Sequence, residues 1–155
     1  MTTLLWFSLY VAGLSKSMDG SYNLDACWLL RGGRPVVRFD LVNRKEIHVD
    51  IPFSKLPWND HLIMFLYRGG LSAGFELKQK YFLRDFSPDL VAVGPNGTIS
   101  EEIPLDKHFQ DVGSAENVRR LIFMWSYSTA ATGAQRHDFN GVIYFYDEQN
   151  KCSEK

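Results

Sequence analysis

The chain has 155 residues, of which 45% are hydrophobic, 14% aromatic and 23% charged. This composition excludes disordered and low-complexity classes and fits one globular domain that buries a core without disulfides or metals. The formal net charge of −1 gives no electrostatic footprint for a nucleic acid or an anionic membrane, so neither partner is expected.

The first residues and the two cysteines indicate the compartment in which the protein is expected. The apolar segment 4–14 is too short to span a bilayer and is predicted to be a buried first strand. Its alternative interpretation is the core of a signal peptide, which would make the protein secreted. Cys27 and Cys152 lie far apart and form neither a disulfide framework nor a zinc-ligand spacing. A reducing, cytoplasmic compartment is therefore expected.

Short strands separated by turn residues follow along the chain. Asp19 and Gly20 form a polar turn before a strand over 22–30, whose side chains alternate with a period of two. The further turns, where glycine, proline or asparagine interrupts apolar runs, are at 31–35, 43–45 and 94–97. The further strands are expected at 36–42, 46–51, 61–67, 89–93, 102–106, 121–127 and 141–146.

Two apolar strands and one helix candidate stand out. The run over 61–67 predicts a central strand covered on both faces, and 121–127 is equally apolar. The segment 107–119 is the best helix candidate, although Gly113 makes it a short connector.

This succession of short strands predicts an all-β fold. We expect an antiparallel β-sandwich of about eight or nine strands with one short connecting helix. Residues 1–155 would form a single domain, with 147–155 as a solvated tail.

No catalytic constellation is recognisable, so the chain is not expected to be an enzyme. The sequence contains no P-loop, dinucleotide-binding or nucleophile-elbow motif. Cys27 lies in a predicted strand and is expected to be an inert core thiol. The four histidines have no metal-ligand spacing and no acid-base partner on the same strand face; they are His48, His61, His108 and His137.

One stretch resembles a known family. Residues 18–30, Met-Asp-Gly-Ser-Tyr-Asn-Leu-Asp-Ala-Cys-Trp-Leu-Leu, and the following strand 39–43 resemble the start of the TerD family of tellurite-resistance and stress proteins. Residues 102–106, 121–123 and 139–147 resemble the later half of that family.

The resemblance implies a calcium-binding β-sandwich of the stress response without known catalysis. By motif position, Asp19, Asp25 and Asp40 are the matching acidic residues. Calcium takes about six to eight oxygen ligands, whereas this chain has Asn23 and a basic pair at 44–45 where the family usually carries acids. Any Ca²⁺ site is therefore expected to be weak or lost. Without an ion, Asp19 would cap a turn and Asp25 would face solvent or pair with an arginine.

Three aromatic residues are candidate contact residues, because exposed aromatics anchor protein interfaces. They are Trp58, Phe75 and Tyr81. We expect a non-enzymatic, TerD-like binding or interaction module that acts through a protein partner or self-association. The alternative is a structural subunit of a larger assembly, such as a viral or phage particle or another multiprotein complex. A third hypothesis, a secreted carbohydrate-binding sandwich, depends on the signal-peptide interpretation.

Overall fold

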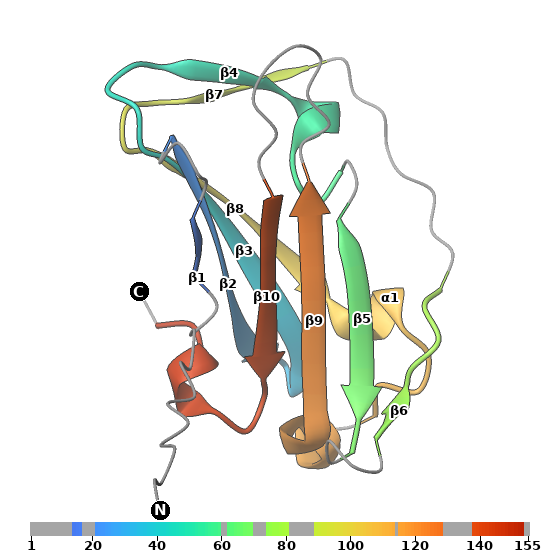
Figure 1. The fold of residues 1–155 in the computed structure, drawn as a ribbon. Helices are drawn as coiled ribbons and strands as arrows, with labels where there is room; N and C mark the ends of the chain where they lie inside the picture. The colour runs from blue at the N-terminus through green and yellow to red at the C-terminus, as the bar shows by residue number, and fades with distance from the viewer. Residues whose placement is uncertain are drawn as a thin grey trace, which may run out of the picture.

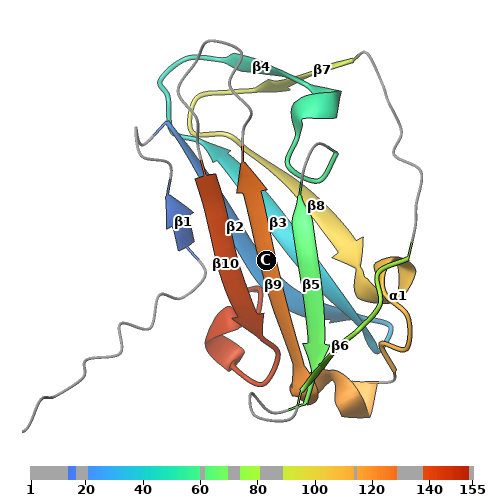
Figure 2. The same cartoon turned by 45° about the vertical axis from the view of Figure 1, so that its right-hand side comes forward.

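The computed structural model describes residues 14–16, 21–59, 62–69, 74–80, 89–113, 115–128 and 138–153. Two four-stranded antiparallel sheets lie face to face, and a two-stranded ribbon closes one end (Figures 1 and 2). Sheet one has the order β1 (Leu14–Lys16), β2 (Tyr22–Arg31), β3 (Arg34–Asn43), β8 (Thr98–Pro104). Sheet two has the order β10 (Asp138–Tyr144), β9 (Leu121–Ser128), β5 (Ile63–Arg68), β6 (Phe75–Glu76). The ribbon pairs β4 (Val49–Pro52) with β7 (Leu90–Val93).

The predicted all-β antiparallel sandwich is confirmed, and its turns form where glycine permits them. Gly32 and Gly33 have φ values of 57° and 77°, and Arg31 pairs with Arg34 around them. Two consecutive left-handed residues match the right-handed twist of the flanking strands, so the two-residue loop joins β2 and β3 directly. The first strand predicted at 4–14 lies outside the described residues except for Leu14, which opens β1.

The core lies between the two sheets and is built from alternate residues of each strand. Phe39 of β3 packs edge-on against Phe123 and Trp125 of β9, with ring centroids 6.3 and 5.1 Å away. Each fully buried side chain of this size contributes about 1.5–3 kcal/mol to folding. Gly141 of β10 faces Trp125, and a Cβ there would lie 2.7 Å from the indole Nε1. The glycine therefore makes room for the tryptophan.

A single asparagine joins sheet one to the ribbon. Asn43, at the end of β3, is fully buried and is the only buried polar residue in the described part of the chain. Its Nδ2 donates to the carbonyls of Ile47, Val93 and Gly94 at 2.9, 3.2 and 3.0 Å, and its Oδ1 accepts from the backbone N–H of Lys45 at 2.9 Å. One side chain thus supplies the hydrogen bonds that the bend from β3 to β4 leaves unmade.

The helix predicted over 107–119 is interrupted. Only α1 (Leu105–His108) and the 3₁₀ helix η2 (Ala115–Arg120) form, with η1 (Phe53–Lys55) and η3 (Glu148–Asn150) elsewhere. Asp111 and Gly113, between α1 and η2, have φ values of 55° and 82°. Left-handed residues end a right-handed helix. The apolar residues within 107–119 therefore belong largely to a buried loop and not to a continuous helix.

The C-terminal segment is anchored to sheet one by a disulfide. Cys27 of β2 is bonded to Cys152, with 5.0 Å between their Cα atoms. Beside it, the Cys152 N–H donates to the Trp28 carbonyl at 2.8 Å, and Trp28 Nε1 donates to the Asp147 carbonyl at 3.1 Å. Lys151 forms a parallel bridge with Trp28.

These contacts bear on two expectations. Within the predicted solvated tail at 147–155, Cys152 is 9% exposed and bonded to Cys27, whereas Glu148, Gln149 and Lys151 are exposed. The expectation that Cys27 is an inert core thiol is wrong, because its sulfur is part of the disulfide. The argument for a reducing compartment loses its basis, because stable disulfides are typical of oxidising ones.

Replacing Asn43 with alanine should lower the free energy of unfolding by about 2–4 kcal/mol, because it leaves several buried backbone groups without partners. Urea denaturation measures the change. Asn59→Ala is the matched control, since Asn59 Nδ2 makes one bond, to the Phe53 carbonyl at 3.1 Å, and should cost about 1 kcal/mol. Equal losses in the two variants would contradict the role assigned to Asn43.

Breaking the disulfide should destabilise the fold strongly, because it closes a loop over a sequence separation of 125 residues. The chain-entropy estimate for such a loop is about 5 kcal/mol. We expect Cys152→Ser to lower the urea midpoint, and dithiothreitol to lower the wild-type midpoint to the same value. The Cys27→Ser/Cys152→Ser double variant should be insensitive to dithiothreitol. A wild-type midpoint unchanged by the reductant would refute the prediction.

Candidate functional site: the outer face of sheet two

The acidic residues predicted to bind calcium lie partly on sheet one. Asp25 of β2 is directly opposite Asp40 of β3 in the register. Asp40 is paired with Arg38 at 3.2 Å and accepts a hydrogen bond from Ser100 at 2.5 Å. Asp19 lies outside the described residues. Two of the three predicted carboxylates are therefore neighbours, and one of them already has a cationic partner.

The surroundings of Asp25 do not complete a calcium site. Burial raises the pKa of its carboxyl above the usual range, and nearby Asp40 adds to this against the opposing charge of Arg44. Its Oδ1 is buried without a hydrogen-bond partner. Among the residues that the structure describes, no three of the types His, Cys, Asp and Glu come together as a metal cluster. These residues alone fall short of the oxygen ligands that calcium needs, so the calcium site stays a prediction.

The predicted contact residues are dispersed. Trp58 is half-buried and packs against the core. Phe75, in β6 at the edge of sheet two, is 57% exposed. Tyr81 lies outside the described residues. Of the three predicted contact residues, only Phe75 presents most of its side chain to solvent in the described part.

A more coherent surface lies on the outer face of sheet two. The strand register arranges its nine outward residues in three rows across β5, β9 and β10. We name these the hollow row (Ile63, Ser126, Asn140), the middle row (Phe65, Met124, Val142) and the ring row (Tyr67, Ile122, Tyr144). Together they are called the outer face.

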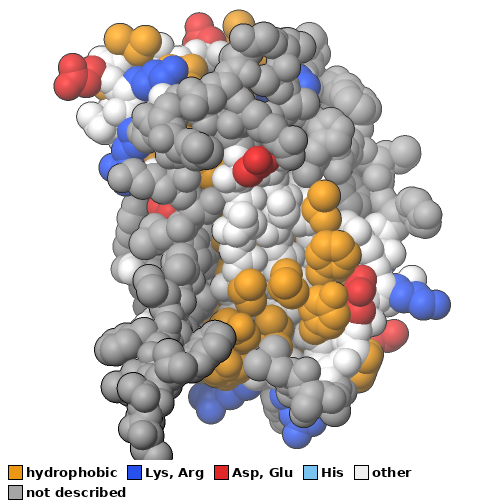
Figure 3. Space-filling model, in the orientation of Figure 1, with side chains coloured by type: hydrophobic (Ala, Val, Ile, Leu, Met, Phe, Trp, Pro, Cys, Tyr) orange, Lys and Arg blue, Asp and Glu red, His pale blue; other side chains and the backbone are white. Residues whose placement is uncertain are grey.

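The outer face is largely apolar and partly open to solvent, with Ile122 of the ring row 8% exposed. Ile63, Phe65 and Met124 are 53%, 41% and 41% exposed, and Figure 3 shows hydrophobic side chains gathered over these strands. None of the nine side chains is charged. A contiguous exposed apolar patch on a sandwich marks an interaction site more often than scattered apolar residues do.

The outer face of sheet one has the opposite character. There, oppositely charged side chains form ion pairs: Arg31 of β2 pairs with Glu102 of β8 at 2.5 Å, and Arg38 pairs with Asp40 within β3 at 3.2 Å. A sheet with one face on the core and one face in water is normally built this way. The outer face of sheet two departs from that pattern.

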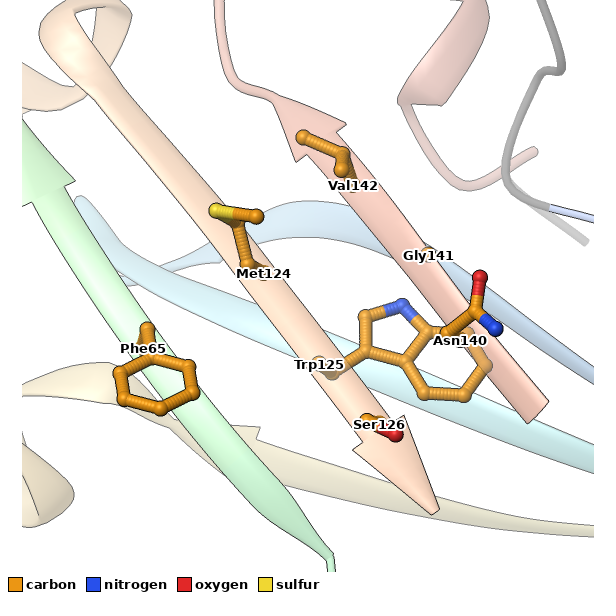
Figure 4. Close-up of a pocket in the computed structure, with 7 residues that line it drawn as sticks. All are labelled: Phe65, Met124, Trp125, Ser126, Asn140, Gly141 and Val142. Atoms are coloured by element: carbon orange, nitrogen blue, oxygen red, sulfur yellow. The ribbon is translucent and has the colours of Figure 1, made fainter. Parts of the chain in front are cut away.

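The shape of the outer face also changes along the strands, and we call this change in height its relief. Beside the hollow row is a hollow of about 240 Å³. Figure 4 labels the residues that line it: Phe65, Met124, Trp125, Ser126, Asn140, Gly141 and Val142. At the other end, the rings of Tyr144 and Tyr146 lie 5.3 Å apart, and Tyr146 is 55% exposed. The face is thus recessed at one end and carries aromatic rings at the other.

The apolar run over 61–67, which forms part of this face, predicts a strand covered on both faces. In β5, Met64 and Leu66 are buried, whereas Ile63 and Phe65, which alternate with them, are exposed. The predicted cover on the second face is therefore wrong for Ile63 and Phe65. On the same face, Ile122 of β9 is 8% exposed.

Comparison of the chain with protein-family models, curated proteins and solved structures found no match in any of the three. The resemblance to the TerD family therefore stays a prediction. None of the helices in the described segments has the length and apolar character needed to cross a membrane.

The raised pKa of Asp25 predicts a pH dependence of stability. A carboxyl whose folded-state pKa is raised favours folding below its unfolded value, which is 3.8, and this contribution is lost as the pH rises through the folded-state pKa. At pH 7, Asp25→Asn should therefore stabilise the protein, by less than about 1 kcal/mol because the site is half open to solvent. Urea denaturation at pH 7 and pH 3 measures the gain, which should shrink at pH 3.

A destabilised Asp25→Asn variant at pH 7 without calcium would contradict this assignment. The same preparations test the ion. Calcium raises the wild-type melting temperature only if it binds the folded state, and Asp25→Asn would then remove that rise.

Proposed function

We propose that the protein is a non-enzymatic, TerD-like β-sandwich that acts as an interaction module, with the outer face of sheet two as its contact surface. The observation that carries the proposal is the uncharged patch formed by the hollow, middle and ring rows, in which Ile63, Phe65 and Met124 are exposed. Covering apolar surface releases about 25 cal/mol per Å². A partner that lies on this face therefore gains binding energy without desolvating a charge.

The composition of the outer face fits a protein partner. Aromatic residues and methionine are enriched at the centres of protein interfaces, where charged residues are depleted. Met124 is central in the middle row, with Phe65 and Val142 on either side. Its flexible thioether adapts to the shape of an apposed surface. Exposed Ser126 at one end offers a hydroxyl group that orients the partner.

The rigid sheet behind this surface also favours a contact role. In β9, Met124 lies between buried residues: Phe123 and Trp125 are 0% and 2% exposed. Because the buried neighbours fix the backbone, the outward side chains are presented with little loss of entropy on binding. The alternative role, a structural subunit of a larger assembly, would use the same face.

Photo-crosslinking tests the proposal. The photoreactive amino acid p-benzoylphenylalanine is placed at Phe65, and the protein is irradiated both pure and in extract of its source cells. We expect protein adducts in at least one preparation. The matched control carries the same amino acid at Leu90, which is 63% exposed on the ribbon and should give few adducts. The proposal fails if position 65 gives no protein adduct, or no more than position 90.

A further inference from the structure

We infer that the partner of the outer face is the outer face of a second copy of this chain. The two copies are related by a two-fold axis that lies between the sheets and runs across the strands at the middle row. The inference rests on the proposed function and specifies its partner. An isologous contact of this kind uses the same patch twice, so the patch must be complementary to itself.

The relief of the face provides that complementarity. Rotation about an axis across the strands places the hollow row of one copy opposite the ring row of the other. On β10, Tyr144 of the second copy then faces Asn140, beside the hollow of about 240 Å³. On β9, Ile122, which is 8% exposed, lies opposite Ser126, and Met124 on the axis meets its own equivalent. The match of a large side chain with a small one is therefore carried by β10, whereas on β5 Tyr67 lies opposite Ile63.

The other two-fold arrangement fits less well. An axis along β9 would place the hollow row opposite itself and the ring row opposite itself. The hollows would then face each other unfilled, while Tyr144 and Tyr67 from both copies would hold the sheets apart. Voids and crowding both cost packing energy. The axis across the strands is therefore the arrangement that the side chains favour.

Charge supports the same axis. None of the three rows contains a charged side chain, so two copies approach without like charges meeting. Exposed Asp138 lies beyond the hollow row, where it pairs with Ser128 in the register. Exposed Arg120 lies beyond the ring row, immediately before β9. The axis across the strands brings Asp138 of one copy toward Arg120 of the other, which is electrostatically complementary.

The size of the face predicts a weak dimer. Three strands about 4.8 Å apart and three rows about 7 Å apart give a patch on the order of 300–400 Å² per copy, counting the side-chain margins. Two such patches bury less than the roughly 1,200 Å² of a standard stable complex. The dimer should therefore form and dissociate with concentration.

Sedimentation velocity from about 10 μM to about 1 mM protein tests the inference, with a charge pair designed on β10. Asn140→Glu places a carboxylate against Tyr144 of the other copy, and Tyr144→Lys removes the ring that faces Asn140. Each variant alone should weaken dimerisation at least about tenfold. A one-to-one mixture should recover association, because the introduced carboxylate and ammonium then face each other.

Thr98→Arg, at an exposed position of β8 in sheet one, is the control and should leave the dimer unchanged. Melting temperatures confirm that each variant is folded. A wild-type protein that stays monomeric at the highest concentration overturns the inference, and so does a dimer weakened only by Thr98→Arg. A dimer that the mixture fails to restore overturns the axis across the strands. Monomeric protein that still forms adducts from position 65 with another protein would overturn the inference and leave the proposed function standing.

Discussion

The structure depends on a constraint of geometry: a sheet has two faces, and in a two-layer sandwich only one of them can meet the other sheet. In sheet one this constraint is satisfied in the usual way, with Phe39 inside and the Arg38–Asp40 pair outside. In sheet two both faces are apolar. Phe123 and Trp125 fill the core, whereas Met124 between them is 41% exposed. The surplus apolar surface of sheet two is therefore the feature that connects this fold to a function.

The rest of the fold holds that surface in place. Asn43 satisfies the backbone of the bend from sheet one into the ribbon, and the Cys27–Cys152 bond fixes the C-terminal segment to β2. That segment follows directly from β10 through Phe145, which is fully buried and packs against Trp28 with ring centroids 5.3 Å apart. One edge of sheet two is thus tied to sheet one by packing and by a covalent bond. Such cross-links leave the outer face as a rigid platform.

Local patterns were sufficient to predict the strands, whereas features made by distant residues were not predictable. Period-two alternation and the glycines of the 31–35 turn identified the β2–β3 hairpin. No local pattern indicates that Cys27 meets Cys152. The turn that begins at Asn43 looked polar and exposed, because the burial of its first side chain depends on carbonyls of β7 and the loop after it. The periodicity over 107–119 came from real burial of Phe109 and Val112, but left-handed residues exclude a continuous helix. For the site, the sequence predicted Phe75 as a contact residue but did not predict the outer face. The sequence of a strand that is apolar on both faces does not indicate what covers each face.

The most direct measurement of the central claim is a dilution series of methyl-labelled protein observed by NMR. If two outer faces pair, the methyl signals of Met124 and Ile63 should shift progressively with concentration, while those of Leu66 and Leu121, which are fully buried in the core, should stay in place. Signals from the outer face that remain fixed over the whole range, or shifts that arise instead from sheet one, would contradict the account.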